Sequence, residues 1–224
     1  MAATDRVSAA AILVAAGSGV RLGAAGPKAF VEVGGRSLLA HALERFVAHP
    51  AIGEVVVAIP AGVPAELVAP ARAVVGGATR QESVAAGLAA VGDAEFVLVH
   101  DVARPFVPAA VIDAVLAALV AGADAAVPVV AIHDTVRRID ARGALVETVD
   151  RTTLVAVQTP QGFRRAVLAE AHARGAELTA TDDAVLVEAI GGTVVAVPGD
   201  DAAFKITTPA DLARAAAHLA ERRP

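Results

Sequence analysis

The hydrophobic positions along the chain alternate between two patterns. Short, continuous apolar runs predict buried parallel strands, and they cover residues 11–14, 55–59, 96–99, 125–127 and 193–197. Between these runs, apolar residues recur at helical spacing, as in Leu39, Leu43, Phe46 and Val47, then Val84, Leu88 and Val91, then Ile112, Val115, Leu116 and Leu119. Strands that alternate with helices predict an α/β fold with a doubly wound, mostly parallel sheet.

One polar segment, residues 132–151, interrupts this rhythm. Its apolar and polar residues alternate on both sides of a turn at Arg142 and Gly143, so we expect a β-hairpin arm that projects from the sheet. A lone hairpin is unstable in water. We therefore expect the arm to pack on a partner subunit.

The whole chain, residues 1–224, is expected to form one domain that includes this arm. No linker or repeat divides the sequence, and its length suits one large α/β domain. The last helix has a clear start, because Thr208 supplies a capping hydroxyl, Pro209 occupies the first helical position and Asp211 the third.

A glycine-rich loop follows the first apolar run. It contains Gly17, Gly19 and Gly23 and presents two cations, Arg21 and Lys28. The spacing fails the G-x-G-x-x-G dinucleotide motif, and the loop lacks the G-K-[ST] ending of a P-loop. Backbone N–H groups and positive charge in such a loop suit a polyphosphate. The alternative is a surface turn with two solvated cations.

Composition excludes several kinds of function. The net charge is −5, aromatic residues make up 3% of the chain, and Trp and Tyr are absent, so we expect no nucleic-acid partner. The absence of cysteine excludes disulfides, thiolate catalysis and Cys-ligated zinc. No apolar run reaches membrane-spanning length and the N-terminus lacks a signal pattern, so we expect a cytoplasmic protein without a membrane partner.

Further chemistry follows other predicted strands, at the edge where ligands bind in open parallel sheets. Asp101 closes one strand, and we favour a magnesium or water-network anchor over a turn cap for it. His100 is interpreted as a packed or solvent-facing residue, because no second His lies at metal spacing. Lys205 lies in an apolar run that we interpret as a strand, where a lysine requires an anion.

Other polar positions have two readings each. Gly76 and Gly77 suit either a turn before a helix or a nucleotide contact. Thr181 or Asp182 caps a helix expected to begin at Ala184, and a substrate contact is the alternative. Arg104 and Arg151 could also be ordinary surface charges.

Seven blocks together resemble one enzyme family. They are residues 15–23 with Pro27 and Lys28, 76–84, 99–105, 134–135, 158–161, 181–184 and 205–211. In this order and spacing they resemble the 2-C-methyl-D-erythritol 4-phosphate cytidylyltransferases over nearly the whole chain. Two positions depart from the family pattern: Val102 replaces a usual Ala, and Ala203 a common Asn.

The resemblance implies a Rossmann-like nucleotidyltransferase fold and a reaction of CTP with a sugar-alcohol phosphate that releases pyrophosphate. It implies that Arg21 and Lys28 face the triphosphate and that Lys205 steadies the pentacoordinate phosphorus. Asp101 would lie near the substrate hydroxyls and near Mg²⁺, which is bound mainly through the CTP phosphates. A phosphate monoester is already largely dianionic near neutral pH, so the nucleophile needs no general base.

The resemblance also implies the binding residues. The nucleotide would contact Ala15, Ala16, Gly17, Gly19, Gly77 and Ser83. The substrate phosphate would lie near Arg104, Thr135, Arg151 and Thr159. The arm would form a homodimer, so that Thr135 and Arg151 act in the partner's site.

Two rival functions stay open. One is a cytidylyltransferase of similar fold that acts on ribitol 5-phosphate. The other is a non-catalytic nucleotide-binding regulator, which would not require Arg21, Lys28 and Lys205 together.

Overall fold

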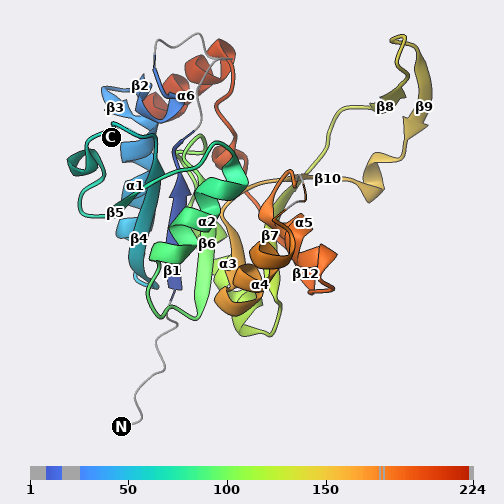
Figure 1. Ribbon diagram of the computed structural model, residues 1–224. Helices are drawn as coiled ribbons and strands as arrows, with labels where there is room; N and C mark the ends of the chain where they lie inside the picture. Colours follow the sequence, from blue (N-terminus) through green and yellow to red (C-terminus); the bar gives the residue numbers. More distant parts are fainter. Residues whose placement is uncertain (1–8, 17–25, 177, 179, 222–224) are drawn as a thin grey trace.

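The computed structural model describes residues 9–16, 26–176, 178 and 180–221, and its centre is a mostly parallel sheet (Figure 1). Six strands run in one direction: β1 (Ala9–Val14), β4 (Ile52–Ile59), β5 (Arg72–Val75), β6 (Phe96–Asp101), β7 (Ala125–Ala131) and β12 (Val194–Pro198). Their carboxyl ends therefore meet at one edge of the sheet. This confirms the expected doubly wound α/β fold.

Two short antiparallel strands pair with β7, and one of them lies between β7 and β6. β10 (Val155–Val157) pairs with the carboxyl end of β7, while β11 (Gln161–Arg164) pairs with both β6 and the amino end of β7. The sheet order is therefore β12, β7, then β10 and β11 end to end, then β6, β1, β4 and β5. The break between β10 and β11 places residues 158–160 beside the carboxyl end of β6.

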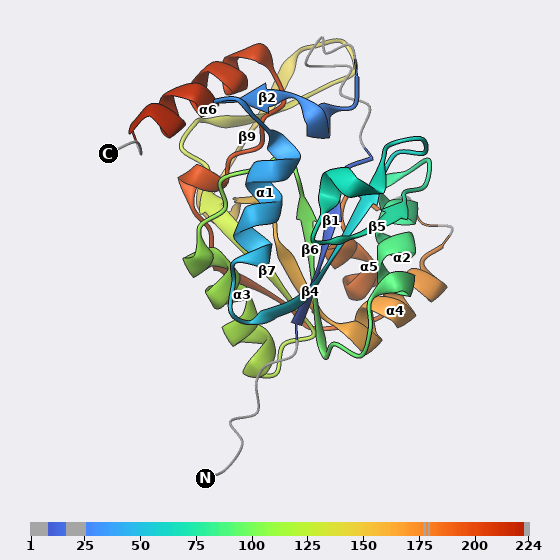
Figure 2. The same cartoon turned by 90° about the vertical axis from the view of Figure 1, so that its left-hand side faces the viewer.

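Helices cover both faces of the sheet (Figure 2). One face packs against α1 (Leu38–Val47) and α3 (Ala109–Val120), through a core that includes Leu13, Phe46, Leu98 and Ile112. The other face packs against α2 (Arg80–Ala90), α4 (Arg165–Arg174) and α5 (Asp183–Ala189). Alternate residues of the buried strands enter the two cores, which explains their continuous apolar sequence.

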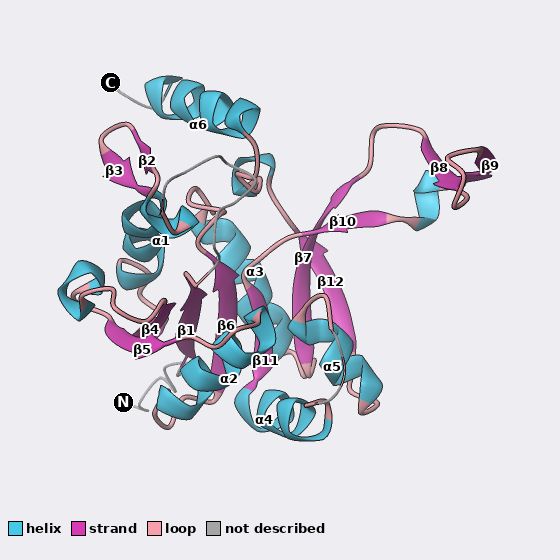
Figure 3. Cartoon of the chain, turned by 45° about the horizontal axis from the view of Figure 1, so that its top comes forward, coloured by secondary structure: helices cyan, strands magenta, loops and turns pink. Residues whose placement is uncertain are grey.

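A third, smaller core lies above the carboxyl edge. The hairpin β2 (Glu32–Val33) and β3 (Arg36–Ser37) packs against α6 (Pro209–Glu221), as Figure 3 shows. The expected start of α6 is confirmed: the Thr208 backbone N–H donates to Asp211 Oδ2 over 2.8 Å, and the Asp211 N–H donates to Thr208 Oγ1 over 3.3 Å. Among the described residues, no helix has the length and apolarity that crossing a membrane requires.

The hairpin arm projects from the body of the molecule (Figure 1). It consists of β8 (Val136–Ile139) and β9 (Leu145–Val149), joined through a turn in which Gly143 has φ 86°. Side chains on the arm are exposed, including the apolar Ile139 and Leu145 at 61% each. The structure confirms the hairpin within residues 132–151.

Short 3₁₀ helices complete the chain: η2 (Lys28–Phe30), η3 (Ala65–Val68), η4 (Arg151–Thr153) and η5 (Asp201–Ala203). Two sequence-based expectations are corrected here. Lys205 lies in an irregular segment between η5 and α6, and the apolar residues around it pack on neighbouring elements without strand pairing. The helix expected from Ala184 begins one residue earlier, at Asp183.

Gly162 in β11 lies directly under α3, and we expect Gly162→Ala to destabilise the protein. An added Cβ would clash with Val115 Cγ1 and lie 3.0 Å from Leu119 Cδ1. Overpacking of this kind costs about 1–3 kcal/mol of unfolding free energy. Gly53→Ala in β4 is the matched control, because its Cβ would meet only a carbonyl oxygen at 3.9 Å. Denaturant unfolding should separate the two variants, and equal stabilities would contradict this packing argument.

Candidate active site

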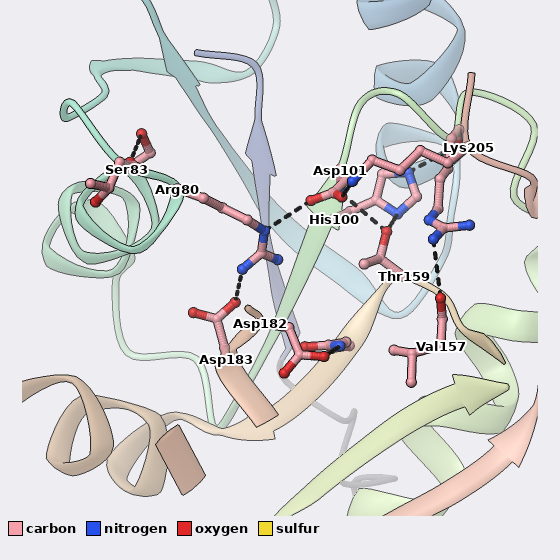
Figure 4. A network of polar contacts seen from close by, with 12 residues as sticks. Arg80, Ser83, His100, Asp101, Val157, Thr159, Asp182, Asp183 and Lys205 are labelled. Carbon is pink, nitrogen blue, oxygen red and sulfur yellow. Dashed lines mark hydrogen bonds and ion pairs between the residues drawn. The ribbon is translucent and has the colours of Figure 1, made fainter. Parts of the chain in front are cut away.

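A chain of ion pairs lies at the carboxyl edge of the sheet, centred on Asp101 at the end of β6 (Figure 4). Lys205 Nζ lies 2.7 Å from Asp101 Oδ2, and Arg80 Nε lies 3.1 Å from Oδ1. The Asp101 side chain is 13% exposed. Burial alone would raise its pKa, but Arg80 and Lys205 outweigh burial and hold that pKa well below the usual range for Asp. Asp101 is therefore a carboxylate at neutral pH.

Arg80 joins Asp101 to a second, fully buried carboxylate. Its Nη1 lies 2.6 Å from Asp183 Oδ2, and the other oxygen of Asp183 lies 2.9 Å from His172 Nε2. Burial would raise the pKa of Asp183, but the His172 hydrogen bond and Arg80 lower it. The chain of polar contacts thus runs from His172 in α4 through α5 and α2 to β6.

The sequence interpretation gave Arg80 and Asp183 no role in a charge network. Both lie within the motif blocks, at the starts of α2 and α5. A cation directly after the capping residue Thr79 and a doubled Asp at a helix start were the available signals. Asp182 caps α5, as expected, because its side chain accepts from the Val185 N–H over 3.2 Å.

His100 is packed in the interior, as one of the two expectations stated. Its Nε2 lies 3.1 Å from the Arg104 carbonyl oxygen and its Nδ1 lies 3.1 Å from Thr159 Oγ1. A carbonyl only accepts, so Nε2 carries the proton. Burial lowers the pKa of His100 to about 4, which keeps the ring neutral. Thr159 then donates its hydroxyl hydrogen to His100 and accepts the Asp101 N–H over 3.1 Å.

Arg104 points its guanidinium toward two backbone carbonyls. Nη1 donates to the Ala203 oxygen over 2.8 Å, and Nη2 donates to the Val157 oxygen over 3.1 Å. Its Nε is buried and has no hydrogen-bond partner in the described part of the chain. Arg104 therefore connects the turn after Asp101 to β10 and to the end of η5.

Small residues line the edge next to this network. A Cβ on Gly76 would lie 2.8 Å from Ala16 Cβ, and a Cβ on Gly77 would clash with Glu82. Ser83 is buried, donates to the Thr79 carbonyl over 2.9 Å and accepts from the Gly77 N–H over 3.2 Å. The loop after β5 therefore turns tightly beside Ala16, at the start of α2.

The other predicted site residues belong to the glycine-rich loop or to the arm. In the loop, Gly17, Gly19 and Arg21 lie outside the described residues, and Lys28, which follows them, begins η2. Thr135 and Arg151 are exposed on or beside the arm. Within the part of the chain that the structure describes, neither side chain forms a hydrogen bond or ion pair with Asp101, whose side chain pairs with Arg80 and Lys205.

No group of three or more His, Asp or Glu side chains is arranged to hold a metal ion, within residues 9–16, 26–176, 178 and 180–221. Asp101 remains the predicted carboxylate near a phosphate-bound cation.

The two carboxylates give an expected acid sensitivity. Because the pKa values of Asp101 and Asp183 are lowered in the folded state, their stabilisation is complete above the unfolded pKa, near 4, and is lost as pH falls below it. Asp183→Asn should lower the unfolding free energy at pH 7 by about 3–5 kcal/mol and weaken the remaining acid dependence. Glu170→Gln is the control, because it removes an exposed ion pair with Arg174. It should change the unfolding free energy at pH 7 by about 1 kcal/mol at most. Urea unfolding from pH 7 to pH 3 measures both, and parallel curves for the three proteins would contradict this account.

The sequence of the chain matches a known protein family. The family model of 2-C-methyl-D-erythritol 4-phosphate cytidylyltransferase matches residues 9–221. Curated proteins of that name include one from Nocardia farcinica, 47% identical over 225 residues (96% of this chain and 95% of the relative), and one from Deinococcus radiodurans, 52% identical over 210 residues (93% and 88%).

Solved structures agree with this result. The crystal structure of 2-C-methyl-D-erythritol 4-phosphate cytidylyltransferase from Thermus thermophilus has a TM-score of 0.80 and 45% identity, and the match covers 93% of this chain and 98% of that one. The 4-diphosphocytidyl-2C-methyl-D-erythritol synthase of Anaerococcus prevotii has a TM-score of 0.83 and 30% identity, covering 96% and 100%. The match in sequence and the match in fold both span nearly the full chain, and this chain therefore belongs to the 2-C-methyl-D-erythritol 4-phosphate cytidylyltransferase family.

Proposed function

We propose that this protein transfers a cytidylyl group from CTP to 2-C-methyl-D-erythritol 4-phosphate, which yields 4-diphosphocytidyl-2-C-methyl-D-erythritol and pyrophosphate in the non-mevalonate isoprenoid pathway. The observation that carries the proposal is the pairing of Lys205 with Asp101 at the carboxyl edge of the sheet, in a chain that matches the family over residues 9–221. That pair combines a cation for a reacting phosphate with an acceptor for hydroxyl groups.

In this reaction an oxygen of the substrate phosphate attacks the α-phosphorus of CTP. The bond between the α-phosphorus and the oxygen that bridges the α- and β-phosphates breaks, and that oxygen leaves as part of pyrophosphate. The attacking phosphate is already largely a dianion, so catalysis depends on in-line positioning and on neutralising charge. Arg21 and Lys28 neutralise the triphosphate, and Lys205 stabilises the charge that develops on the pentacoordinate phosphorus.

Asp101 receives the substrate hydroxyl groups. It is ionised and acceptor-only, because Arg80 and Lys205 lower its pKa. Arg80 Nε lies 3.1 Å from Asp101 Oδ1, so Arg80 would balance the charge of Asp101 when Lys205 turns toward phosphate. Asp101 thus accepts hydrogen bonds from the alcohol while Lys205 serves the phosphorus.

The nucleotide occupies the small-residue edge. Ala16 and Gly77 leave room for the ribose and base to approach the backbone, and Ser83 holds the Gly77 N–H in place. The full nucleotide-binding set consists of Ala15, Ala16, Gly17, Gly19, Gly77 and Ser83.

The divalent cation of the reaction is Mg²⁺. Magnesium typically binds through substrate phosphates and one or two carboxylates, and Asp101, the less buried of the two carboxylates that pair with Arg80, fits that donor set. When bound, the ion would help to neutralise the CTP phosphates.

The enzyme acts as a cytoplasmic homodimer, with the arm of each chain reaching the partner. The exposed apolar side chains of Ile139, Leu145 and Val146 support this arrangement. A hairpin that stands alone in water is unstable, and burying these side chains against a partner would stabilise the arm. Arg104 and Thr159 of one chain, with Thr135 and Arg151 of the partner subunit, form the side that receives the substrate phosphate.

Pyrophosphate release from CTP and Mg²⁺ tests the function, with a panel that contains 2-C-methyl-D-erythritol 4-phosphate and ribitol 5-phosphate. The expected result is release with the methylerythritol phosphate and little with ribitol 5-phosphate. The reverse preference would make the protein a ribitol-phosphate enzyme. CTP binding without release from any alcohol phosphate would make it a nucleotide-binding regulator.

A further inference from the structure

Lys205 lies on a segment without regular structure, yet the proposed reaction requires its ammonium group at one place. The segment 204–207 connects η5 to α6, and the Lys205 side chain is 42% exposed. Strand pairing does not hold it. Something else must therefore fix the backbone on either side of this lysine.

Two hydrogen bonds supply that fixation, one before and one after Lys205. Arg104 Nη1 donates to the Ala203 carbonyl over 2.8 Å, and the Ile206 N–H donates to the Ala103 carbonyl over 2.8 Å. Both partners belong to the turn that directly follows Asp101. The segment that carries Lys205 is thus tied to the segment that carries its ion-pair partner.

Arg104 is itself held firmly in this position. Its Nη2 donates to the Val157 carbonyl at the end of β10, and its own carbonyl accepts from His100 Nε2. Its Nε is buried, so that edge of the guanidinium does not reach a ligand. A planar guanidinium can donate to two carbonyls in fixed directions, which no other side chain reproduces at this length.

We propose that Arg104 is a positioning residue, which acts on the reaction through Lys205 by holding the segment that carries it. This inference rests on the proposed function and changes one part of it, because it replaces the direct contact between Arg104 and the substrate phosphate with an action through Lys205. Removing the guanidinium would leave the Ala203 carbonyl without its partner and would let the Lys205 ammonium group shift.

A double-mutant cycle of Arg104→Met and Lys205→Met separates the two roles. Arg104→Met alone should lower kcat roughly 10-fold to 100-fold, the scale of a small displacement of a catalytic group. In the Lys205→Met background the same change should lower kcat by less than about threefold, because the group that it positions is gone. KM for both substrates should change little.

Arg164→Met is the matched control, because Arg164 also donates to a backbone carbonyl, that of Leu119 over 3.0 Å. Its effect on kcat should be small and equal in the wild-type and Lys205→Met backgrounds.

A second measurement does not depend on turnover. Lys28 and Lys205 are the only lysines in the sequence, so amine acetylation followed by mass spectrometry reports on each separately. Arg104→Met should raise the labelling rate of Lys205 as its pair with Asp101 loosens, and it should leave that of Lys28 unchanged. Arg104→Gln, which keeps one donor, should have an intermediate effect and serves if Arg104→Met does not fold.

Direct phosphate binding by Arg104 would give the opposite pattern. The losses would then multiply in the double variant, KM for the alcohol phosphate would rise in both backgrounds, and Lys205 labelling would not change. Any of these three results overturns the proposal. Failure of the proposed function would appear separately, in the assay of the wild-type enzyme. The double-mutant cycle would then be run with whichever alcohol phosphate releases pyrophosphate. The labelling measurement needs no substrate and is independent of that outcome.

Discussion

A Lys28→Ala chain and an Arg151→Ala chain, each inactive as a homodimer, should recover pyrophosphate release when they are combined in one dimer. If each site takes Lys28 from one chain and Arg151 from the other, the mixed dimer has one pocket with both lesions and one with neither. About half of the wild-type activity should therefore return, since one of two pockets is intact. The arm's projection from the body supports this crossed arrangement (Figure 1).

The measurement requires two affinity tags and purification of the verified mixed dimer. A mixed dimer of Lys28→Ala and Lys205→Ala chains is the control, because both residues belong to the same half of the site and every pocket keeps one lesion. It should stay inactive. Absence of recovery in the Lys28 and Arg151 mixture would return Arg151 to its own subunit or to the surface.

Lys205→Met should fold and bind CTP, yet lower kcat by roughly 10²–10³, the scale for removing one charge that stabilises a transition state. The ammonium group is exposed enough to turn from Asp101 toward a phosphate, and its charge matters most as the α-phosphorus gains a fifth ligand. Steady-state kinetics and calorimetric CTP binding measure the two effects. Lys205→Arg, which keeps the charge, should lose less. A loss confined to CTP affinity would assign Lys205 to ground-state binding.

The buried strands could be predicted from the sequence because their signal is local. Residues 55–59 and 96–99 are continuous apolar runs, and both belong to strands of the sheet. β10 and β11 were missed because both are short and β11 is partly polar, and because their pairing with β6 and β7 depends on contacts between distant parts of the chain. The expectation of a strand at Lys205 was wrong for a related reason. Its apolar neighbours Phe204 and Ile206 are packed against α6, and an apolar run does not reveal whether a strand or a packed loop buries it.

The site was predictable only in part. The seven motif blocks named Asp101 and Lys205, and the structure brings them to 2.7 Å. Arg80 was quoted in a motif without a role, since its two carboxylate partners lie 21 and 103 residues away along the chain. No spacing rule covers ion pairs of that separation. The same holds for Arg104, whose partner Ala203 offers only a backbone carbonyl.

The chain of polar contacts from His172 to Lys205 has a consequence for local unfolding. It joins α4, α5, α2 and β6, so these segments should open only together with the core, and their amide hydrogens should exchange at the rate of global unfolding. The arm has few buried contacts and should exchange quickly on its own. If the active site combines both parts, as proposed, its two halves have independent stabilities. Mild denaturant or dilution should release the arm and stop turnover while the half around Asp101 keeps its native protection.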